Sequence, residues 1–269
     1  MTSRRTFLQT ATASLAAVSA AAAKHNLTLG VASYSLRKFS RERAIEMIKA
    51  CQAPYVSVKS FHLDYKATPA EFALARKQFK DAGITVLSGG NIDLKGPETE
   101  IRAMFEYAKA AGFPMIVCAP SEATTPFVEK MVKEYNIRAA IHNHGPEDKH
   151  YPSPQSVLAV IKNMDPRMGL CVDIGHTART GVDVVKSLAE AGPRLFDMHV
   201  KDLKNLSDKD SQCAVGEGAM PMREIFSQLR KMNYKGACML EYEIKADDPL
   251  PGMLKSFEHM RKVLSEMKS

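Results

Sequence analysis

The sequence of 269 residues contains no tryptophan, only five cysteines and no dense cluster of lysines and arginines. None of the cysteines forms a Cys-x-x-Cys pair, which argues against a zinc knuckle or a redox dithiol. The odd cysteine count, and the apolar runs around Cys118, Cys171 and Cys238, predict buried free thiols. The net charge of +7 is modest, so we expect no nucleic-acid partner. Hydrophobic residues at 45% and charged residues at 25% exclude a disordered chain.

The first 23 residues have the layout of an export signal. Ser3-Arg4-Arg5-Thr6-Phe7-Leu8 precedes a mildly apolar run from Ala11 to Ala23. Paired arginines are typical of a twin-arginine signal, and the run is too short and too rich in alanine for a stable membrane span. We therefore expect residues 1–23 to be a twin-arginine-type signal peptide and residues 24–269 to be the folded domain. The protein would then be exported to the periplasm without a membrane anchor.

Short β-rich runs alternate with amphipathic helical stretches along the rest of the chain. The expected strands are Leu27–Leu36, Tyr55–Leu63, Ile84–Leu94, Met115–Pro120, Ile137–Gly145, Met168–His176, Leu195–Asp202 and Ala237–Glu243. The expected helices are Arg41–Cys51, Pro69–Ala82, Glu98–Ala111, Pro126–Tyr135, Pro154–Met164, Val182–Ala191, Met222–Met232 and Leu250–Met267. Eight such units predict an α/β fold, a single-domain (β/α)8 TIM barrel. An open doubly wound sheet is the alternative, but no G-x-G-x-x-G follows the first strand.

Polar side chains gather where the last four expected strands end. These ends read Ile141-His142-Asn143-His144, Cys171-Val172-Asp173-Ile174-Gly175-His176, His199-Val200-Lys201-Asp202 and Glu241-Tyr242-Glu243. The carboxyl ends of barrel strands meet at one rim, where the chemistry of such barrels is found. Imidazole and carboxylate ligands, without a thiolate, suit one divalent cation such as Mn, Co, Zn or Mg. The predicted ligand set is His142, Asp173, His199 and Glu241.

These strand-end motifs, together with Gly216-Glu217-Gly218, resemble the xylose-isomerase-like barrel family of sugar isomerases, epimerases and AP endonucleases. The resemblance covers residues 27–268. In the keto-sugar epimerases of that family, Glu, Asp, His and Glu from the fifth to eighth strands hold one divalent metal. The last three fall on Asp173, His199 and Glu241, whereas the fifth-strand Glu falls on His142. This departure puts a symmetrical two-glutamate epimerisation in question.

The other polar residues of the rim suggest roles in metal-assisted enolisation next to a carbonyl group. Glu241 would be both ligand and base, with His144 or Lys201 as the partner acid. His176, whose counterpart in the family's epimerases binds substrate, and Glu243 are expected to contact substrate. Lys59 and His62, after the second strand, are further candidate contacts, for which a structural ion pair and a loop hydrogen bond are equally good explanations.

The resemblance implies a small-molecule carbohydrate substrate, and isomerisation or epimerisation of a keto sugar is the first hypothesis. A lyase, hydratase or dehydratase acting on 3-keto-glycosides through the same enolate is the second, and a non-catalytic sugar-binding barrel the third. The endonuclease chemistry of the family needs three metals and a histidine at the position of Gln212, so DNA cleavage is not expected. The sequence leaves open whether the barrel forms a homo-oligomer.

Overall fold

The computed structural model describes residues 27–267, so the predicted signal at residues 1–23 lies outside the described part. Eight parallel strands form a closed barrel in the order β1-β10-β7-β6-β5-β4-β3-β2. The strands are β1 Thr28–Ala32, β2 Tyr55–Val58, β3 Thr85–Leu94, β4 Met115–Pro120, β5 Arg138–His142, β6 Met168–Asp173, β7 Leu195–Val200 and β10 Ala237–Leu240. Barrel closure confirms the predicted (β/α)8 fold and excludes the open doubly wound sheet.

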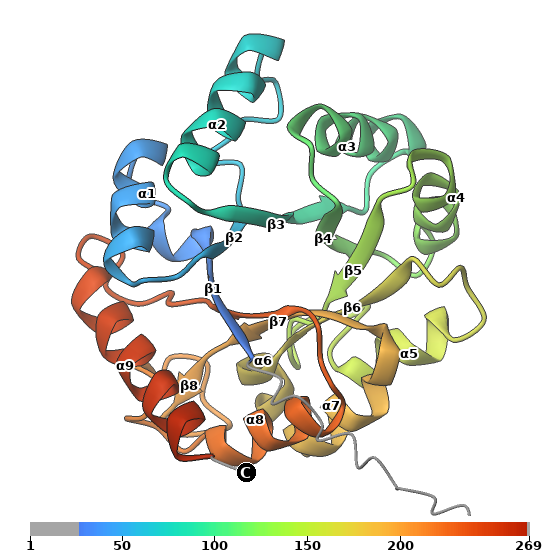
Figure 1. Ribbon diagram of the computed structural model, residues 1–269. Coiled ribbons are helices and arrows are strands. Elements are labelled where there is room, and N and C mark those ends of the chain that lie inside the picture. The colour runs from blue at the N-terminus through green and yellow to red at the C-terminus, as the bar shows by residue number, and fades with distance from the viewer. Residues whose placement is uncertain (1–26, 268–269) are drawn as a thin grey trace, which may run out of the picture.

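Helices surround the strands on the outside of the barrel (Figure 1). They are α1 Arg41–Ala50, α2 Pro69–Asp81, α3 Glu98–Ala111, α4 Thr125–Tyr135, α5 Pro154–Ile161, α7 Val184–Ala191, α8 Met222–Lys231 and α9 Leu250–Glu266. The short helix α6 Ile174–Arg179 lies at one end of the barrel instead, and 3-10 turns occur at Ser33–Leu36 and Gly192–Arg194. Local sequence sets the helix ends: at α2, Thr68 and Glu71 form a reciprocal capping box and Pro69 occupies the first turn. None of the helices described between residues 27 and 267 has the length and hydrophobicity needed to cross a membrane.

Six of the eight expected strands end earlier in the structure than the sequence pattern suggested, at Ala32, Val58, His142, Asp173, Val200 and Leu240. The clearest case is β6, because the Asp173 side chain accepts a hydrogen bond from the backbone N–H of His176 at 2.8 Å. Asp173 therefore caps α6, which begins at the next residue and was not predicted. His142, Asp173 and His199 therefore lie at the ends of their strands, and the other polar residues lie on the loops and helix starts just beyond the barrel.

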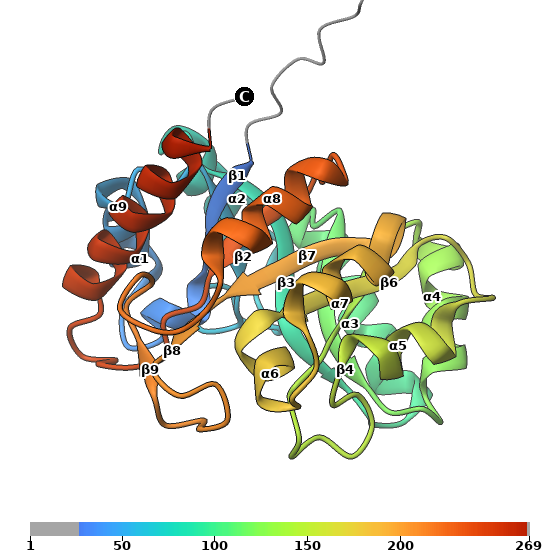
Figure 2. The same cartoon turned by 90° about the horizontal axis from the view of Figure 1, so that it is seen from below.

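A two-stranded hairpin, β8 Asp202–Leu203 and β9 Gln212–Cys213, follows β7. It lies on the same side of the barrel as α6 (Figure 2), the side on which the carboxyl ends of the strands open. The strands beneath are packed with buried apolar residues, and β4 and β6 are buried along their whole length. A rigid barrel thus holds a set of polar loops at one end.

Candidate metal centre

The strand register brings the four predicted metal ligands together. Asp173 on β6 lies opposite His199 on β7, and His142 on β5 lies opposite Cys171 on β6. On the other side of β7, Met239 of β10 lies opposite His199, so Glu241 follows two residues beyond it. Three strand pairs, formed by residues far apart in sequence, therefore place these side chains at one rim.

The ligand atoms of His142, Asp173, His199 and Glu241 all lie within 4.8 Å of one another. His199 Nδ1 is 2.9 Å from His142 Nε2, 3.0 Å from Glu241 Oε2 and 3.9 Å from Asp173 Oδ2. Two ligand atoms that are each about 2.1 Å from a common metal lie roughly 3–4 Å apart. The spacing therefore fits a shared divalent cation, so the four predicted ligands form one group that could hold a metal.

One carboxylate oxygen of this group is also free of hydrogen bonds from the described residues and could bind a cation. All four side chains are buried, yet Asp173 Oδ2 accepts no hydrogen bond in the described structure, although the Lys201 ammonium is 3.1 Å away. A buried carboxylate oxygen is costly unless a positive charge neutralises it, and a bound divalent cation would share that role with the Lys201 ammonium. Despite its burial, Lys201 and His176 hold the pKa of Asp173 well below its ordinary value. The carboxylate is thus ionised and available for coordination.

Glu241 is likewise kept ionised. Burial alone would raise its pKa, but His199 and Lys201 hold the pKa of Glu241 well below the ordinary value. Burial also opposes protonation of His199, yet the neighbouring Cys171 and Glu241 raise the pKa of His199 well above its ordinary value. The two ionised carboxylates, Asp173 and Glu241, therefore make this end of the barrel favourable for a positive charge. A carboxylate held ionised in this way suits the ligand role expected of Glu241, whereas its role as a base stays a prediction.

Lys201 lies inside this site and not beside it. Its ammonium is 3.0 Å from Glu241 Oε2 and 2.5 Å from Glu243 Oε2, and its side chain is only 4% exposed. Although burial disfavours the charge, Asp173 and the two glutamates raise the pKa of Lys201 well above its ordinary value. The residue is therefore a fixed positive charge and a three-proton donor. Burial raises the pKa of Glu243 instead, so its carboxyl is the more easily protonated of the two glutamates.

His144 forms a separate pair with an acid. Its Nε2 accepts a hydrogen bond from the Asn91 amide at 2.8 Å, which leaves the proton on Nδ1, 3.2 Å from Asp148 Oδ2. Burial lowers the pKa of His144, so the ring is neutral near pH 7. The ring centroid lies 4.3 Å from that of His142. Asp148 and Asn91 were not predicted, because nothing in the sequence spacing links them to His144.

His176 also lies at the rim, with Nε2 4.0 Å from Asp173 Oδ2. Arg179 donates a hydrogen bond to its Nδ1 at 2.9 Å, and Glu147 holds the guanidinium of Arg179 in turn. Burial lowers the pKa of His176 to about 4. The structure therefore presents a neutral imidazole whose Nε2 faces the site, as a substrate hydroxyl would require, and the substrate-binding role stays a prediction.

The two candidates after β2 differ from each other. His62 is 2% exposed, and its ring nitrogens contact Ser33 Oγ at 3.0 Å and the Leu36 carbonyl at 3.2 Å. The geometry thus favours the loop hydrogen bond for His62. Lys59 donates to the carbonyl of Asn91, the residue that contacts His144, and forms none of the ion pairs found among residues 27–267, which argues against the structural explanation. Lys59 is therefore the better placed of the two to reach a substrate.

Two parts of the motifs have a structural purpose. The buried Asp202 carboxylate accepts hydrogen bonds from four backbone N–H groups, those of Leu203, Gly216, Gly218 and Met220, at 2.8–3.1 Å. A Cβ at Gly218 would collide with this carboxylate, which explains that glycine. Gln212 binds the neighbouring strand end, donating to the Glu241 carbonyl at 2.8 Å and accepting from the Glu243 N–H at 3.1 Å. Asp202 and Gln212 therefore fix the loops on which the site residues lie.

The chain is similar in sequence to proteins of a known family. The profile of the xylose isomerase-like TIM barrel family matches residues 43–263, and the chain belongs to that family. A curated relative, the uncharacterized protein MJ1311 of Methanocaldococcus jannaschii, is 29% identical over 92 residues, which cover 33% of this chain and 31% of the relative. The matched part thus spans about a third of that relative's length.

Two solved structures share the fold over nearly their whole length. The 3-keto-D-glucoside 4-epimerase from E. coli superposes with a TM-score of 0.72 at 14% identity, covering 88% of this chain and 99% of the epimerase. The IOLI protein, solved with a bound zinc atom, superposes with a TM-score of 0.75 at 14% identity, covering 90% of this chain and all of that protein. The chain is therefore a xylose isomerase-like barrel with a buried His/Asp/His/Glu group that can hold a metal.

Proposed function

We propose that the protein is a divalent-metal-dependent isomerase or epimerase of a keto sugar or keto-sugar derivative, acting by enolisation. The observation that carries this proposal is the placement of two proton-transfer groups beside one potential metal centre. These groups are the Lys201–Glu243 pair and the His144–Asp148 pair. A pure binding site would need no such pairs next to its ligands. The sugar epimerase that shares the fold supports the choice of substrate class.

A divalent cation held by His142, Asp173, His199 and Glu241 would act as a Lewis acid for the negative charge that develops on the carbonyl oxygen. The Lys201 ammonium lies in the same part of the site and supplies a fixed positive charge with N–H donors. Such preorganised donors stabilise developing charge without reorganising during the reaction. Lys201 would thus orient the carbonyl and a neighbouring hydroxyl, while Glu243, the more easily protonated of the two glutamates, would carry the proton.

His144 is the stronger candidate for the base that removes the proton next to the carbonyl. Its Nδ1 proton faces Asp148, which orients the ring and stabilises the imidazolium that proton removal creates. Within residues 27–267, its Nε2 accepts a hydrogen bond only from the Asn91 amide, a partner that a substrate group can replace. Return of the proton from Glu243 to the other face would invert the carbon, whereas return to the neighbouring carbon would isomerise the sugar.

The proposal is tested by incubating the Mn-loaded protein in D2O with free ketohexoses and 3-keto-glucosides and following the products by NMR. We expect deuterium at the carbon next to the carbonyl, together with a new sugar isomer. Exchange should be lost in Asp173→Asn and fall by a factor of about 10² or more in His144→Asn. His150→Asn, in the same loop, is the matched control and should behave like the wild type. Metal binding without any exchange would refute the proposal and favour a sugar-binding barrel.

A second candidate, a lyase or hydratase of 3-keto-glycosides, is favoured by one particular feature. The site has a histidine, His142, where the resembling epimerases have a glutamate, so the two sides of the substrate would face unlike groups. Enolisation with a leaving group at the β position ends in elimination when the proton is not returned. The same NMR experiment distinguishes it, because release of the aglycone with an unsaturated keto sugar or its hydrate would establish the lyase.

We also propose that the chain is exported through the signal at residues 1–23. The basis is the sequence pattern alone, with Arg4 and Arg5 before the apolar run. When the full chain is expressed in a bacterium with a twin-arginine pathway, the folded domain should be recovered from the periplasm. The double substitution Arg4→Lys and Arg5→Lys should keep it in the cytoplasm, and equal export of both forms would contradict the proposal.

A further inference from the structure

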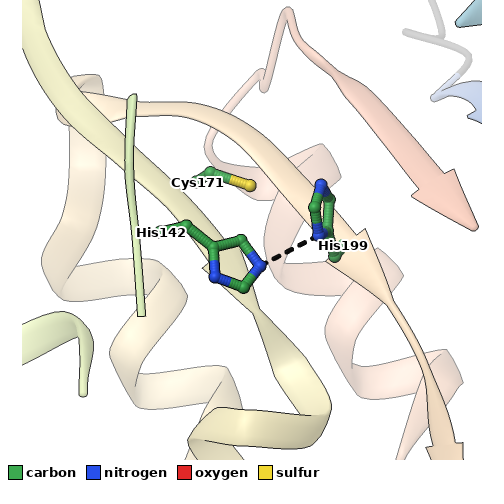
Figure 3. A group of neighbouring side chains, drawn as sticks. All are labelled: His142, Cys171 and His199. Atoms are coloured by element: carbon green, nitrogen blue, oxygen red, sulfur yellow. Dashed lines mark hydrogen bonds between the residues drawn. The ribbon is translucent and has the colours of Figure 1, made fainter. Parts of the chain in front are cut away.

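Cys171 lies against the same two imidazoles that serve the metal centre. Its sulfur and one nitrogen each of His142 and His199 lie within 4.8 Å of one another, and all three residues are buried. Figure 3 shows the Cys171 sulfur pointing from β6 toward the two rings. Nothing in the spacing of the cysteines indicated this, because the histidines come from other strands. The cluster also departs from the expected ligand chemistry, which contained no thiolate.

The position of Cys171 follows from the sheet. Cys171 and Asp173 are two residues apart on β6, so their side chains share the inner face, and Cys171 lies about 6–7 Å deeper along the strand. The register places Cys171 directly opposite His142. The sulfur therefore approaches the two imidazoles from the interior of the barrel, while the carboxylates approach them from the rim.

The two imidazole rings also have unused nitrogen atoms. The ring nitrogens His142 Nδ1 and His199 Nε2 are buried and without a hydrogen-bond partner in the described residues. On the rim side, by contrast, the Lys201 ammonium lies within 3.1 Å of both carboxylates and competes with a cation for them. A cation held by sulfur and two imidazoles would avoid that competition.

We propose that His142, Cys171 and His199 form a second, thiolate-containing ligand set that takes a thiophilic divalent cation such as Zn²⁺, Co²⁺ or Cd²⁺. Binding transfers the thiol proton to solvent, and no oxidation or reduction takes place. Hard ions such as Mg²⁺ avoid thiolates and stay with the carboxylate set. Three protein ligands leave a fourth tetrahedral position open, as in zinc sites with catalytic activity.

The test is a Co²⁺ titration of the metal-free protein, followed by absorption in the near ultraviolet. We expect a sulfur-to-cobalt charge-transfer band that saturates at one equivalent. The band should be lost in Cys171→Ser but kept in Cys118→Ser, which changes another fully buried cysteine, on β4. It should also be kept in Glu241→Gln, which removes a ligand of the carboxylate set only.

X-ray absorption of the Zn²⁺-loaded wild type needs no variant and should show one sulfur at about 2.3 Å from zinc. The proposal is overturned if zinc or cobalt binds with no sulfur neighbour, if the band survives Cys171→Ser, or if Glu241→Gln removes it as fully as Cys171→Ser does. None of these results depends on turnover, so they are independent of the proposed sugar chemistry.

Discussion

Replacing Lys201 by methionine removes the one ammonium that lies between the carboxylates of the metal centre while keeping the length of the side chain. The ammonium is 3.1 Å from Asp173 Oδ2 and 3.0 Å from Glu241 Oε2. Opposite charges at 3 Å attract by about 5 kcal/mol at an effective dielectric constant of 20. Desolvation offsets part of this, and removing one partner of a buried pair typically costs about 3–5 kcal/mol. The metal-free variant should therefore unfold roughly 6–20 °C below the wild type.

The same substitution should strengthen binding of a divalent cation. Without the ammonium, the carboxylates have no competing positive charge, and we expect the Kd for Mn²⁺ to fall at least about tenfold, or about 1.4 kcal/mol. Excess Mn²⁺ should then restore more of the lost thermal stability than it adds to the wild type. Calorimetric titration and thermal unfolding with and without Mn²⁺ measure both effects. The exposed Lys231→Met is the control, and an unchanged or weaker Mn²⁺ affinity in Lys201→Met would refute the reasoning.

Three further predictions concern the surroundings of the site. Asp202→Ala leaves four backbone N–H groups without their acceptor and should lower the free energy of unfolding by about 3 kcal/mol or more. Urea titration measures this loss, and a loss below about 1 kcal/mol would contradict the structural role. Gln212→Ala releases the Glu241–Glu243 segment and should lower kcat while changing the free energy of unfolding little. Gln212→Glu should have a kcat below that of the wild type. A loss of stability as large as the loss of kcat, both expressed as free energies, would point to a purely structural role. Burial lowers the pKa of His176 to about 4 in the folded protein, against about 6.5 in the unfolded chain. The metal-free protein should therefore lose about 3 kcal/mol of stability as the pH falls from about 6.5 toward about 4. His176→Asn should flatten this dependence of the free energy of unfolding on pH, and an unchanged dependence would contradict the assignment.

The barrel could be predicted because its signals are local. Apolar runs of strand length alternate with amphipathic stretches, and capping residues such as Thr68 mark where the helices begin. The strand ends were less predictable, because an apolar run does not show where a side chain begins to cap the next helix. Asp173 does so in this chain, and the expected strand therefore ran three residues too far.

The metal group could be predicted for a different reason. Parallel strands bring their carboxyl ends to one rim, so His142, Asp173, His199 and Glu241 meet whatever the details of packing. Contacts that depend on depth or on loop conformation could not be predicted this way. Cys171 lies one layer below the rim and Asp148 reaches His144 from within a loop, so only the register and the loop backbone bring them to the site.

The most direct test of the metal centre is an anomalous difference map from a crystal of the Mn²⁺-loaded protein. The structure predicts one strong peak per chain, about 2.0–2.3 Å from His142 Nε2, Asp173 Oδ2, His199 Nδ1 and Glu241 Oε2. A peak elsewhere, or no peak in a protein that fails to bind Mn²⁺ in solution, would contradict the assignment of this group as the metal centre.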